Sequence, residues 1–292
     1  MPRVPQSISR REQYRIYLNI ILTTVRRWLN RKSPSRTMEG TRREYDKKWK
    51  KWSEGNYLLE GNTETRISLL RGLPVVARQI DYRKHVIEKF ADAINSLQPE
   101  SVLEIGSGNG LNVLCLALLC PTVKRWAGIE LAETGVEAAR NYLKELPLES
   151  IAYVTKVSKE MIAQRIANAQ ITFKKGDMHI LPMRDNEFDF VYSFHVLEQA
   201  PDTYKKALSE AHRVTKKHAA FFEFWNEGQN IFQRIHIRNR GFFQGSFRDV
   251  EPIGFGILRF EVSELTQVAF AGCFLLCAAN KDSQRNDHVR RG

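Results

Sequence analysis

A glycine-rich segment preceded by a carboxylate carries the clearest chemical signal in the chain. The run VLEIGSGNG (102–110) has the form of a strand that enters a tight turn and then opens a helix. A dinucleotide-binding turn would read GxGxxG, and here Gly110 comes one position too early. Glu104, just before the turn, would repel a pyrophosphate and suits a cationic or amine-bearing ligand.

Two further acids stand at comparable places. Glu130 ends the next strand-like stretch, and Asp177 follows the third in Gly176-Asp177-Met178. An acid at the position of Glu130 can accept hydrogen bonds from both ribose hydroxyls of a nucleoside. Because the carboxyl ends of parallel strands meet at one edge of a sheet, where ligands bind, we expect the three acids to converge on one ligand.

Candidate general bases lie near the same edge: His195, Glu198 and Glu223. We favour His195, because it directly follows a predicted strand and an unperturbed imidazole titrates at about pH 6.5. Two other roles stay open for His195, which are to line the cofactor site and to cap the following turn. No paired ligands at metal-binding spacing are visible, so we predict no metal site.

Strand-like and helical patterns alternate from residue 100 onward. This alternation predicts βαβ units, and therefore an α/β fold with a parallel sheet covered by helices on both faces. The segment from Leu258 to Asn280 predicts two more strands around Gly272. The expected parallel strands are Ser101–Ile105, Arg125–Glu130, Ile171–Lys175, Phe188–Phe194 and Ala219–Trp225.

Four stretches of this region resemble the class I S-adenosylmethionine-dependent methyltransferases, in particular the branch that methylates many small molecules. The resemblance implies a Rossmann-like, doubly wound, seven-stranded and mostly parallel sheet with a C-terminal antiparallel strand. Where the family often has Lys-Pro-Gly-Gly, this chain reads Lys216-Lys217-His218-Ala219, away from the cofactor residues. The matching stretches are VLEIGSGNG (102–110), WAGIELAETGVEAAR (126–140), GDMHILPMRDNEFDFVYSFHVLEQ (176–199) and LSEAHRVTKK (208–217).

The resemblance also implies S-adenosyl-L-methionine as the cofactor. Glu104 and residues 106–110 would border its methionine part, Glu130 would hold the ribose hydroxyls, and Asp177 with Met178 would contact the adenine. Ser193 to His195 would face the cofactor and the acceptor. The implied cofactor-binding residues are Glu104, Gly106, Ser107, Gly108, Asn109, Gly110, Glu130, Leu131, Asp177, Met178, Ser193 and Phe194, with His195 as a base or acceptor-facing residue.

The chain divides into four regions by composition and pattern. Two insertions in the third region would help to shape the acceptor pocket, at about 147–170 and 226–257. The regions are a basic amphipathic arm (1–38), a helical N-terminal cap region (39–99), the methyltransferase-like domain (100–282) and a polar tail (283–292).

Most of the net positive charge belongs to the arm. Residues 1–38 hold nine Arg or Lys and one acid, whereas the whole chain carries a net charge of +12. Apolar residues recur there at helical spacing from Tyr14 to Leu29. Three interpretations remain open: a helix packed on its own domain, peripheral contact of residues 10–32 with an anionic membrane surface, and an Arg-rich organellar presequence.

A second basic segment, TRREYDKKWKKW (41–52), interleaves aromatic and basic residues. Such a segment could bind single-stranded nucleic acid. We favour a helix that caps a pocket with Tyr45 and Trp49 and points its lysines at water, because long basic side chains commonly cover apolar surface. Four cysteines lie in apolar stretches, which indicates buried thiols and a reducing, cytoplasmic location unless the arm directs the chain elsewhere.

These observations predict an enzyme that moves a methyl group from S-adenosylmethionine to a small or medium-sized metabolite by in-line displacement. One alternative is an RNA methyltransferase that uses the basic N-terminal segment. Against it, Ser193-Phe194-His195-Val196 stands where an Asn/Asp-Pro-Pro-aromatic motif would be expected. The other alternative is a non-catalytic cofactor-binding scaffold. The sequence does not predict the oligomeric state.

Overall fold

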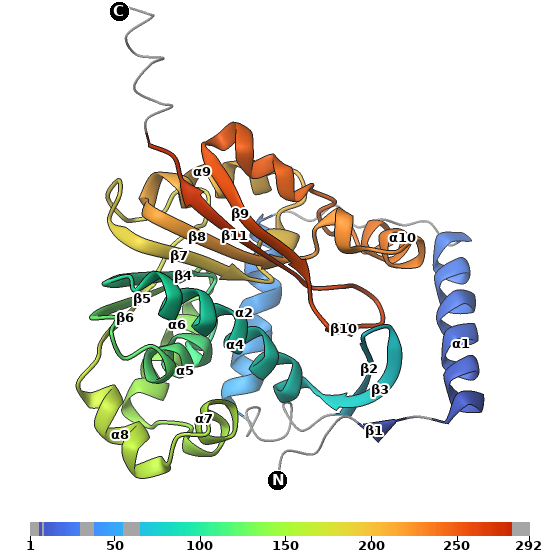
Figure 1. The fold of residues 1–292 in the computed structure, drawn as a ribbon, viewed down its shortest axis with the longest axis horizontal. Helices are drawn as coiled ribbons and strands as arrows, with labels where there is room; N and C mark the ends of the chain where they lie inside the picture. The colour runs from blue at the N-terminus through green and yellow to red at the C-terminus, as the bar shows by residue number, and fades with distance from the viewer. Residues whose placement is uncertain (1–5, 8, 30–37, 55–64, 282–292) are drawn as a thin grey trace, which may run out of the picture.

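A seven-stranded sheet forms the centre of the molecule, which is a computed structural model that describes residues 6–7, 9–29, 38–54 and 65–281 (Figure 1). Five strands are parallel, β11 is antiparallel to β8, and β9 is antiparallel to β11. The predicted fold class is therefore confirmed. In sheet order the strands are β6 (Gln170–Lys175), β5 (Arg125–Glu130), β4 (Ser101–Ile105), β7 (Phe188–Phe194), β8 (Thr215–Glu223), β11 (Cys273–Ala279) and β9 (Phe255–Val262).

Helices cover both faces of this sheet, because the side chains of each strand alternate between two cores. Val102 of β4 points into one core, and its neighbour Leu103 points into the other. The first core is closed by α4 (Gln79–Leu97), α5 (Leu111–Leu119), α6 (Glu133–Lys144), α7 (Leu148–Thr155) and α8 (Lys159–Ala167). The second is closed by η1 (Leu197–Gln199), α9 (Tyr204–Val214), α10 (Ile231–Asn239) and η3 (Phe247–Ile253).

A second, antiparallel sheet corrects the expectation of a wholly helical cap over residues 39–99. Residues 65–78 form a hairpin of β2 (Thr65–Leu70) and β3 (Leu73–Arg78). The turn at Arg71-Gly72 has positive φ at both residues, which matches the twist of a two-residue hairpin. The sheet runs in the order β1 (Gln6–Ser7), β3, β2 and β10 (Leu265–Gln267).

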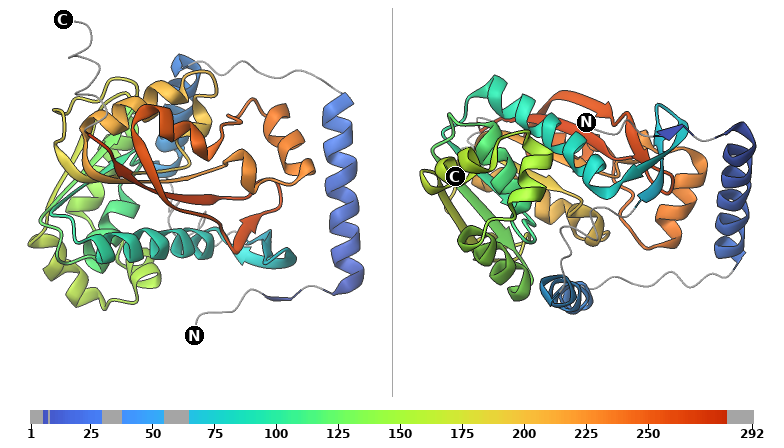
Figure 2. Two further views of the ribbon diagram at one scale, coloured as in Figure 1. Left: turned by 45° about the horizontal axis from the view of Figure 1, so that its top comes forward. Right: turned by 90° about the horizontal axis from the view of Figure 1, so that it is seen from below.

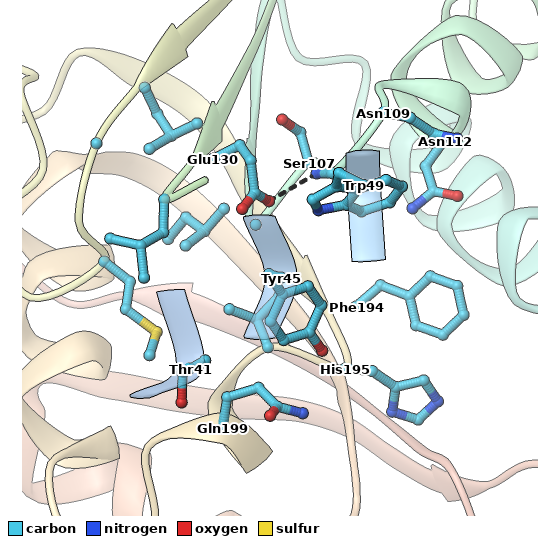
Figure 3. Close-up of a pocket in the computed structure, with 18 of the residues that line it drawn as sticks. Thr41, Tyr45, Trp49, Ser107, Asn109, Asn112, Glu130, Phe194, His195 and Gln199 are labelled. Atoms are coloured by element: carbon cyan, nitrogen blue, oxygen red, sulfur yellow. Dashed lines mark hydrogen bonds between the residues drawn. The ribbon is translucent and has the colours of Figure 1, made fainter. Parts of the chain in front are cut away.

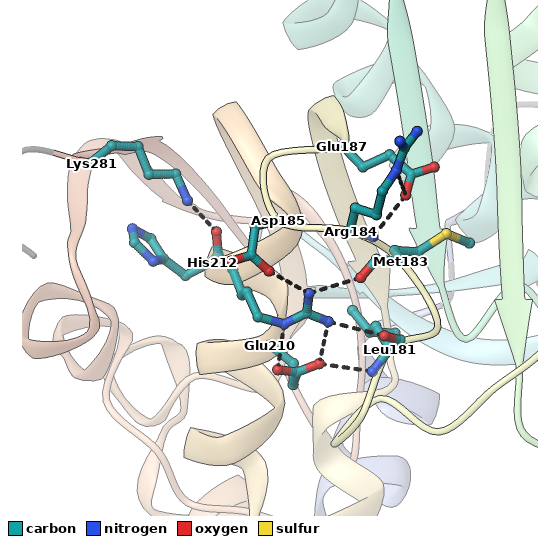
Figure 4. Close-up of polar contacts among 9 residues, drawn as sticks. Leu181, Met183, Arg184, Asp185, Glu187, Glu210, His212 and Lys281 are labelled. Carbon is teal, nitrogen blue, oxygen red and sulfur yellow. Dashed lines mark hydrogen bonds and ion pairs between the residues drawn. The ribbon is translucent and has the colours of Figure 1, made fainter.

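An arginine on α9 fixes the loop between β6 and β7 (Figure 4). The Arg213 guanidinium donates to the carbonyls of Leu181 and Met183 and pairs with Asp185 and Glu210. These partners raise the pKa of Arg213, led by its hydrogen bond to Glu210. The segment LSEAHRVTKK therefore holds the loop that carries Met178 at the sheet edge.

Two helices precede the main domain, α1 (Arg10–Leu29) and α2 (Met38–Glu54). Figure 2 shows α1 at the outer margin, beside α10, and α2 on a different side of the molecule. None of the described helices is both long and apolar enough to cross a membrane. The predicted tail (283–292) lies outside the described residues, as do residues 1–5, 8 and 30–37 of the predicted arm.

Candidate cofactor-binding site

A cavity of about 240 Å³ opens at the carboxyl ends of β4, β5, β6 and β7 (Figure 3). The sheet edge supplies one wall and α2 supplies another. Most of the implied cofactor-binding residues meet here, as the sequence predicts. Those that line the cavity are Gly106, Ser107, Gly108, Asn109, Glu130, Leu131, Met178, Phe194 and His195, and Gly110 begins α5 next to them.

The glycine turn brings bare backbone to the cavity. Gly106, Gly108 and Gly110 all have positive φ. A Cβ on Gly108 would lie 2.6 Å from the ring of Trp49, and a Cβ on Gly106 would collide with Val196. Side chains are excluded at both places by conformation and by space, so the turn is a cradle that only glycine forms.

Glu130 closes the turn from the neighbouring strand. Its Oε2 accepts from the Gly108 amide at 2.9 Å, and its Oε1 accepts from the Ala132 amide at 2.9 Å. Burial raises the pKa of Glu130, and the backbone donors oppose that rise. The carboxylate therefore faces the cavity in a fixed orientation, where each oxygen keeps a further lone pair for a hydroxyl donor.

Helix α2 lies across the opening, which confirms the predicted pocket-capping helix. Thr41, Tyr45 and Trp49 line the cavity, and Trp49 is only 9% exposed. Figure 3 shows the Trp49 ring beside Ser107 of the glycine turn. The Thr134 hydroxyl of α6 lies 3.3 Å from the backbone oxygen of Asp46 and 3.2 Å from the Asp46 carboxylate. These two contacts connect α2 to α6.

Glu104 lies behind the cavity wall and acts through a neighbour. It is fully buried, and its Oε1 accepts from Asn112 Nδ2 at 2.7 Å. Arg83 Nη1 in turn donates to Asn112 Oδ1 at 2.5 Å. Burial raises the pKa of Glu104 to about 7. Arg83 and Asn112 line the cavity, and Asn112 connects Arg83 to the buried Glu104 behind the wall.

Asp177 and Ser193 also do not reach the cavity. The Asp177 carboxylate turns back on His179, accepting from its backbone amide at 2.8 Å and meeting its Nδ1 at 2.7 Å. The flanking Gly176 and Met178 line the cavity instead. Ser193 is buried and donates to Glu223 Oε1 at 2.7 Å. The convergence of three carboxylates at one cavity is thus corrected to Glu130 at the wall and Glu104 behind it.

The sequence of this region matches a known family. Residues 103–222 match the family model described as a methyltransferase domain. They contain the glycine cradle, Glu130 and the parallel strands that position them. Residues 103–222 belong to the class I S-adenosylmethionine-dependent methyltransferases. S-adenosylmethionine is the cofactor of this family.

Curated relatives resemble this methyltransferase domain over part of their length. A protein-L-isoaspartate O-methyltransferase from Shewanella piezotolerans is 32% identical over 84 residues, which are 28% of this chain and 37% of the relative. An uncharacterized 37.1 kDa protein in transposon TN4556 of Streptomyces fradiae is 28% identical over 125 residues, 43% of this chain and 30% of the relative. The chain therefore spans about a third of the length of these relatives.

Solved structures share the fold. The 4+2 cyclase SpnF has a TM-score of 0.58 at 15% identity, covering 85% of this chain and 98% of its own. A magnesium protoporphyrin IX methyltransferase from Synechocystis, with bound S-adenosylhomocysteine, has a TM-score of 0.51 at 18% identity, covering 68% and 84%. These likenesses establish the architecture of the methyltransferase domain.

His195 lines the cavity with a constrained backbone and a fixed imidazole ring. It adopts positive φ, and its Nε2 lies 2.9 Å from Tyr82 Oη. Burial lowers the pKa of His195 to about 4, so the imidazole is neutral near pH 7. A group with this pKa is a weak proton acceptor at neutral pH. His195 thus lines the cavity, while its roles as an acceptor-facing residue and as a base stay predictions.

Sequence reasoning missed four polar or charged residues that line the cavity. Gln79 and Arg83 lie at the start of α4, Asn112 lies in the first turn of α5, and Gln199 lies in η1. Arg83 is one of several charged residues on the amphipathic helix α4, so its presence in the sequence does not show that it faces a cavity. The fold supplies that information when α4 packs beside α5.

Proposed function

We propose that this protein transfers a methyl group from S-adenosylmethionine to a small or medium-sized metabolite. The observation that carries the proposal is the meeting of the glycine cradle, Glu130 and the Arg83–Asn112–Glu104 chain at one cavity of a methyltransferase domain. A zwitterionic amino-acid group fits the opposite charges of Arg83 and Glu104. Hydroxyl donors fit Glu130.

The buried polar atoms of the cavity support this fit. Among the described residues that line the cavity, Arg83 Nε and Ser107 Oγ are buried without a hydrogen-bond partner. Such atoms are costly unless a ligand or water satisfies them. Ser107 belongs to the glycine turn, which is expected at the methionine part of the cofactor.

The residues of this chain then have two tasks. The cofactor supplies a methyl group that is already activated by its sulfonium. Glu130 and the glycine cradle would hold the nucleoside in one orientation, so that the acceptor atom can line up with the methyl carbon. Tyr45 and Trp49 of α2 would exclude water from that line. The sheet-edge residues Phe194 to Val196 and Gln199 would border the acceptor.

Calorimetric titration with S-adenosylhomocysteine tests cofactor binding. We expect one site per chain and a loss of roughly 1–3 kcal/mol in Glu130→Ala, the scale of hydrogen bonds to a charged group. This loss is about 5- to 150-fold in Kd. Glu137→Ala, an exposed position on α6, is the matched control and should bind as the wild type does. Equal affinity in Glu130→Ala would refute the assigned contact, and absence of binding would refute the function.

A labelled-methyl experiment separates the acceptor classes. The protein is incubated with methyl-labelled S-adenosylmethionine and either a small-molecule extract or total RNA. Label in the small-molecule fraction supports the proposal. Label in RNA would favour the alternative that uses the basic N-terminal segment, although Trp49 and Tyr45 line the cavity rather than a nucleic-acid surface.

A cofactor-binding protein without methyl transfer is the second candidate. SpnF shares this fold and is named for a cyclisation, so the fold alone is compatible with other chemistry. Tight binding of S-adenosylhomocysteine, together with no label in either fraction across a broad acceptor panel, would favour this candidate.

A further inference from the structure

Three possible metal ligands converge beside the cavity. His195 follows β7, Glu198 lies in η1, and Glu223 ends β8. One ligand atom of each lies within 4.8 Å of the others. Glu198 and Glu223 are buried, and His195 lines the cavity. The sequence did not show this group of ligands, because Glu223 ends β8 and comes close to His195 and Glu198 only in the folded sheet.

His195 and Glu198 are each oriented by a hydrogen bond at the far atom. Tyr82 Oη lies 2.9 Å from His195 Nε2, and Gln199 Nε2 donates to Glu198 Oε1 at 2.9 Å. The near atoms, His195 Nδ1 and Glu198 Oε2, lie 3.2 Å apart. Ligating groups typically have such outer partners, which fix the tautomer of the imidazole and the direction of the carboxylate.

The two carboxylate oxygens of Glu223 also differ, since one has hydrogen-bond partners and the other does not. Its Oε1 accepts from Ser193 Oγ at 2.7 Å and from the Val196 amide at 3.1 Å. Its Oε2 is buried and accepts no hydrogen bond from any described residue. A fully buried carboxylate oxygen beside a second carboxylate is unfavourable without a cation or a proton.

We propose that His195, Glu198 and Glu223 bind a divalent first-row transition-metal cation at the wall of the cavity. One imidazole nitrogen and two carboxylate oxygens form a mixed ligand set that suits Mn²⁺, Fe²⁺ or Zn²⁺. Three protein ligands leave coordination positions open. Since His195 lines the cavity, the cation would bind and polarise an oxygen of the acceptor, a role that rests on the proposed methyl transfer.

Titration with Mn²⁺ tests the site independently of the cofactor. Chelator-treated protein is titrated, and free Mn²⁺ is followed by electron paramagnetic resonance. We expect one Mn²⁺ per chain, competed by Zn²⁺. Glu223→Gln and Glu198→Gln should each weaken binding by about 10-fold or more, and Tyr82→Phe by a similar factor through the lost orientation of His195. Glu104→Gln, a buried carboxyl on a neighbouring strand, is the matched control and should bind Mn²⁺ normally.

Affinity for S-adenosylhomocysteine reports whether the Glu198, Glu223 and Tyr82 variants fold, and urea unfolding followed by circular dichroism reports it for Glu104→Gln. A wild-type protein that binds neither Mn²⁺ nor Zn²⁺ stoichiometrically would overturn the metal site, while the proposed methyl transfer would stand if S-adenosylhomocysteine still binds. Unchanged Mn²⁺ affinity in both glutamine variants would overturn it as well.

A separate observation concerns the outer face of α1. Seven of its described apolar side chains lie at the surface, from 36% exposed at Ile21 to 77% at Tyr14. Their spacing places them on one face of the helix. Arg15 and Arg26 are exposed along the border of that face. The exposed apolar residues are Tyr14, Tyr17, Leu18, Ile21, Leu22, Val25 and Leu29.

We infer that this face of α1 lies on an anionic lipid surface. The arrangement of an apolar stripe bordered by arginines is that of an interfacial helix, and its charge complements acidic headgroups. Tyr17, at one edge of the stripe, donates its hydroxyl to the Gly72 carbonyl at 2.8 Å, and the other six side chains of the stripe remain exposed. The inference does not depend on the methyl acceptor.

Vesicle sedimentation tests it with phosphatidylcholine alone and with added phosphatidylglycerol. We expect binding to the anionic vesicles, lost by about 10-fold or more in the double variant Leu18→Ser and Leu22→Ser and in Arg15→Gln with Arg26→Gln. Leu258→Ser, at an exposed leucine of β9, is the control. Absence of binding to anionic vesicles, or binding that neither double variant weakens, would overturn the inference, and concentration-dependent dimerisation through α1 would assign the face to a second copy instead.

Discussion

Helices α1 and α2 are both basic and amphipathic, yet the fold treats them in opposite ways. Most of the described apolar side chains of α1 stay at the surface, whereas Trp49 of α2 is buried against the glycine cradle. Helix α2 has a partner of matching shape, because the bare backbone of Gly108 leaves room for the Trp49 ring. Amphipathic periodicity thus predicts a helix and its apolar face, but the complementary surface decides where that face goes.

This contrast divides the N-terminal region by function. Helix α2 is part of the cofactor cavity, so substitutions in it should change the affinity for S-adenosylhomocysteine. None of the described side chains of α1 lines that cavity, so substitutions on its exposed face should leave this affinity unchanged.

The largest effect is expected from Gly108→Ala. The new Cβ would lie 2.6 Å from Trp49, at a residue with φ of +53°, so both the turn and α2 must shift. We expect a loss of about 2–4 kcal/mol in binding S-adenosylhomocysteine. This is at least about 30-fold in Kd. Gly72→Ala is the matched control, since φ there is +82° and the new Cβ meets nothing within 4 Å. Similar losses in both variants would show that strain alone, and not the contact with α2, explains the effect.

The sequence predicted well the strands and the glycine turn that form the cavity under α2. The bounds of β4, β5 and β7 agree with the expected strands, because each is a buried apolar run that ends in a turn signal. The glycine turn and Glu130 followed from the same local patterns. The expected strand Ala219–Trp225 does not match the bounds of β8, which begins at Thr215 and ends at Glu223. Pairing with β7 and β11 determines these bounds, and the sequence alone does not show that pairing.

The failures share a physical origin in contacts between distant segments. Asp177 stands at the expected strand end, but its side chain bonds to the amide of His179 two residues on, as Asp often does in turns. The proximity of Glu223 to His195 arises only when β8 pairs beside β7. The hairpin over residues 65–78 had a local signal in Arg71-Gly72 between two apolar runs, which the helical expectation overlooked.

A smaller effect should distinguish the two helices in stability. Trp49→Ala removes a buried aromatic ring from the cavity wall, and we expect a loss of about 2 kcal/mol in the free energy of unfolding. Leu22→Ala on α1 removes an exposed side chain and should change this free energy by less than about 0.5 kcal/mol. Urea unfolding followed by circular dichroism measures both. Equal losses would mean that α1 is packed against the body as firmly as α2.

The smallest expected effect is a change of S-adenosylhomocysteine affinity with pH, which depends on Glu104 behind the cavity that α2 covers and not on α1. Burial raises the pKa of Glu104 to about 7, above its ordinary value near 4.5. The neutral carboxyl is thus favoured in the free protein, and its contribution to stability is present below about pH 4.5 and is lost as the pH rises through 7.

A cationic amino group bound beside Glu104 favours the ionised carboxylate, so binding of S-adenosylhomocysteine should release a proton from this residue. The affinity should therefore rise by roughly 10-fold between pH 6 and pH 8, which is about 1.4 kcal/mol. Calorimetry in two buffers of different ionisation enthalpy would measure the released proton directly. Glu104→Gln should abolish both the release and the pH dependence, whereas Leu22→Ala on α1 should retain them. If the affinity of the wild-type protein did not change over this pH range, Glu104 would not interact with the amino group of the bound ligand.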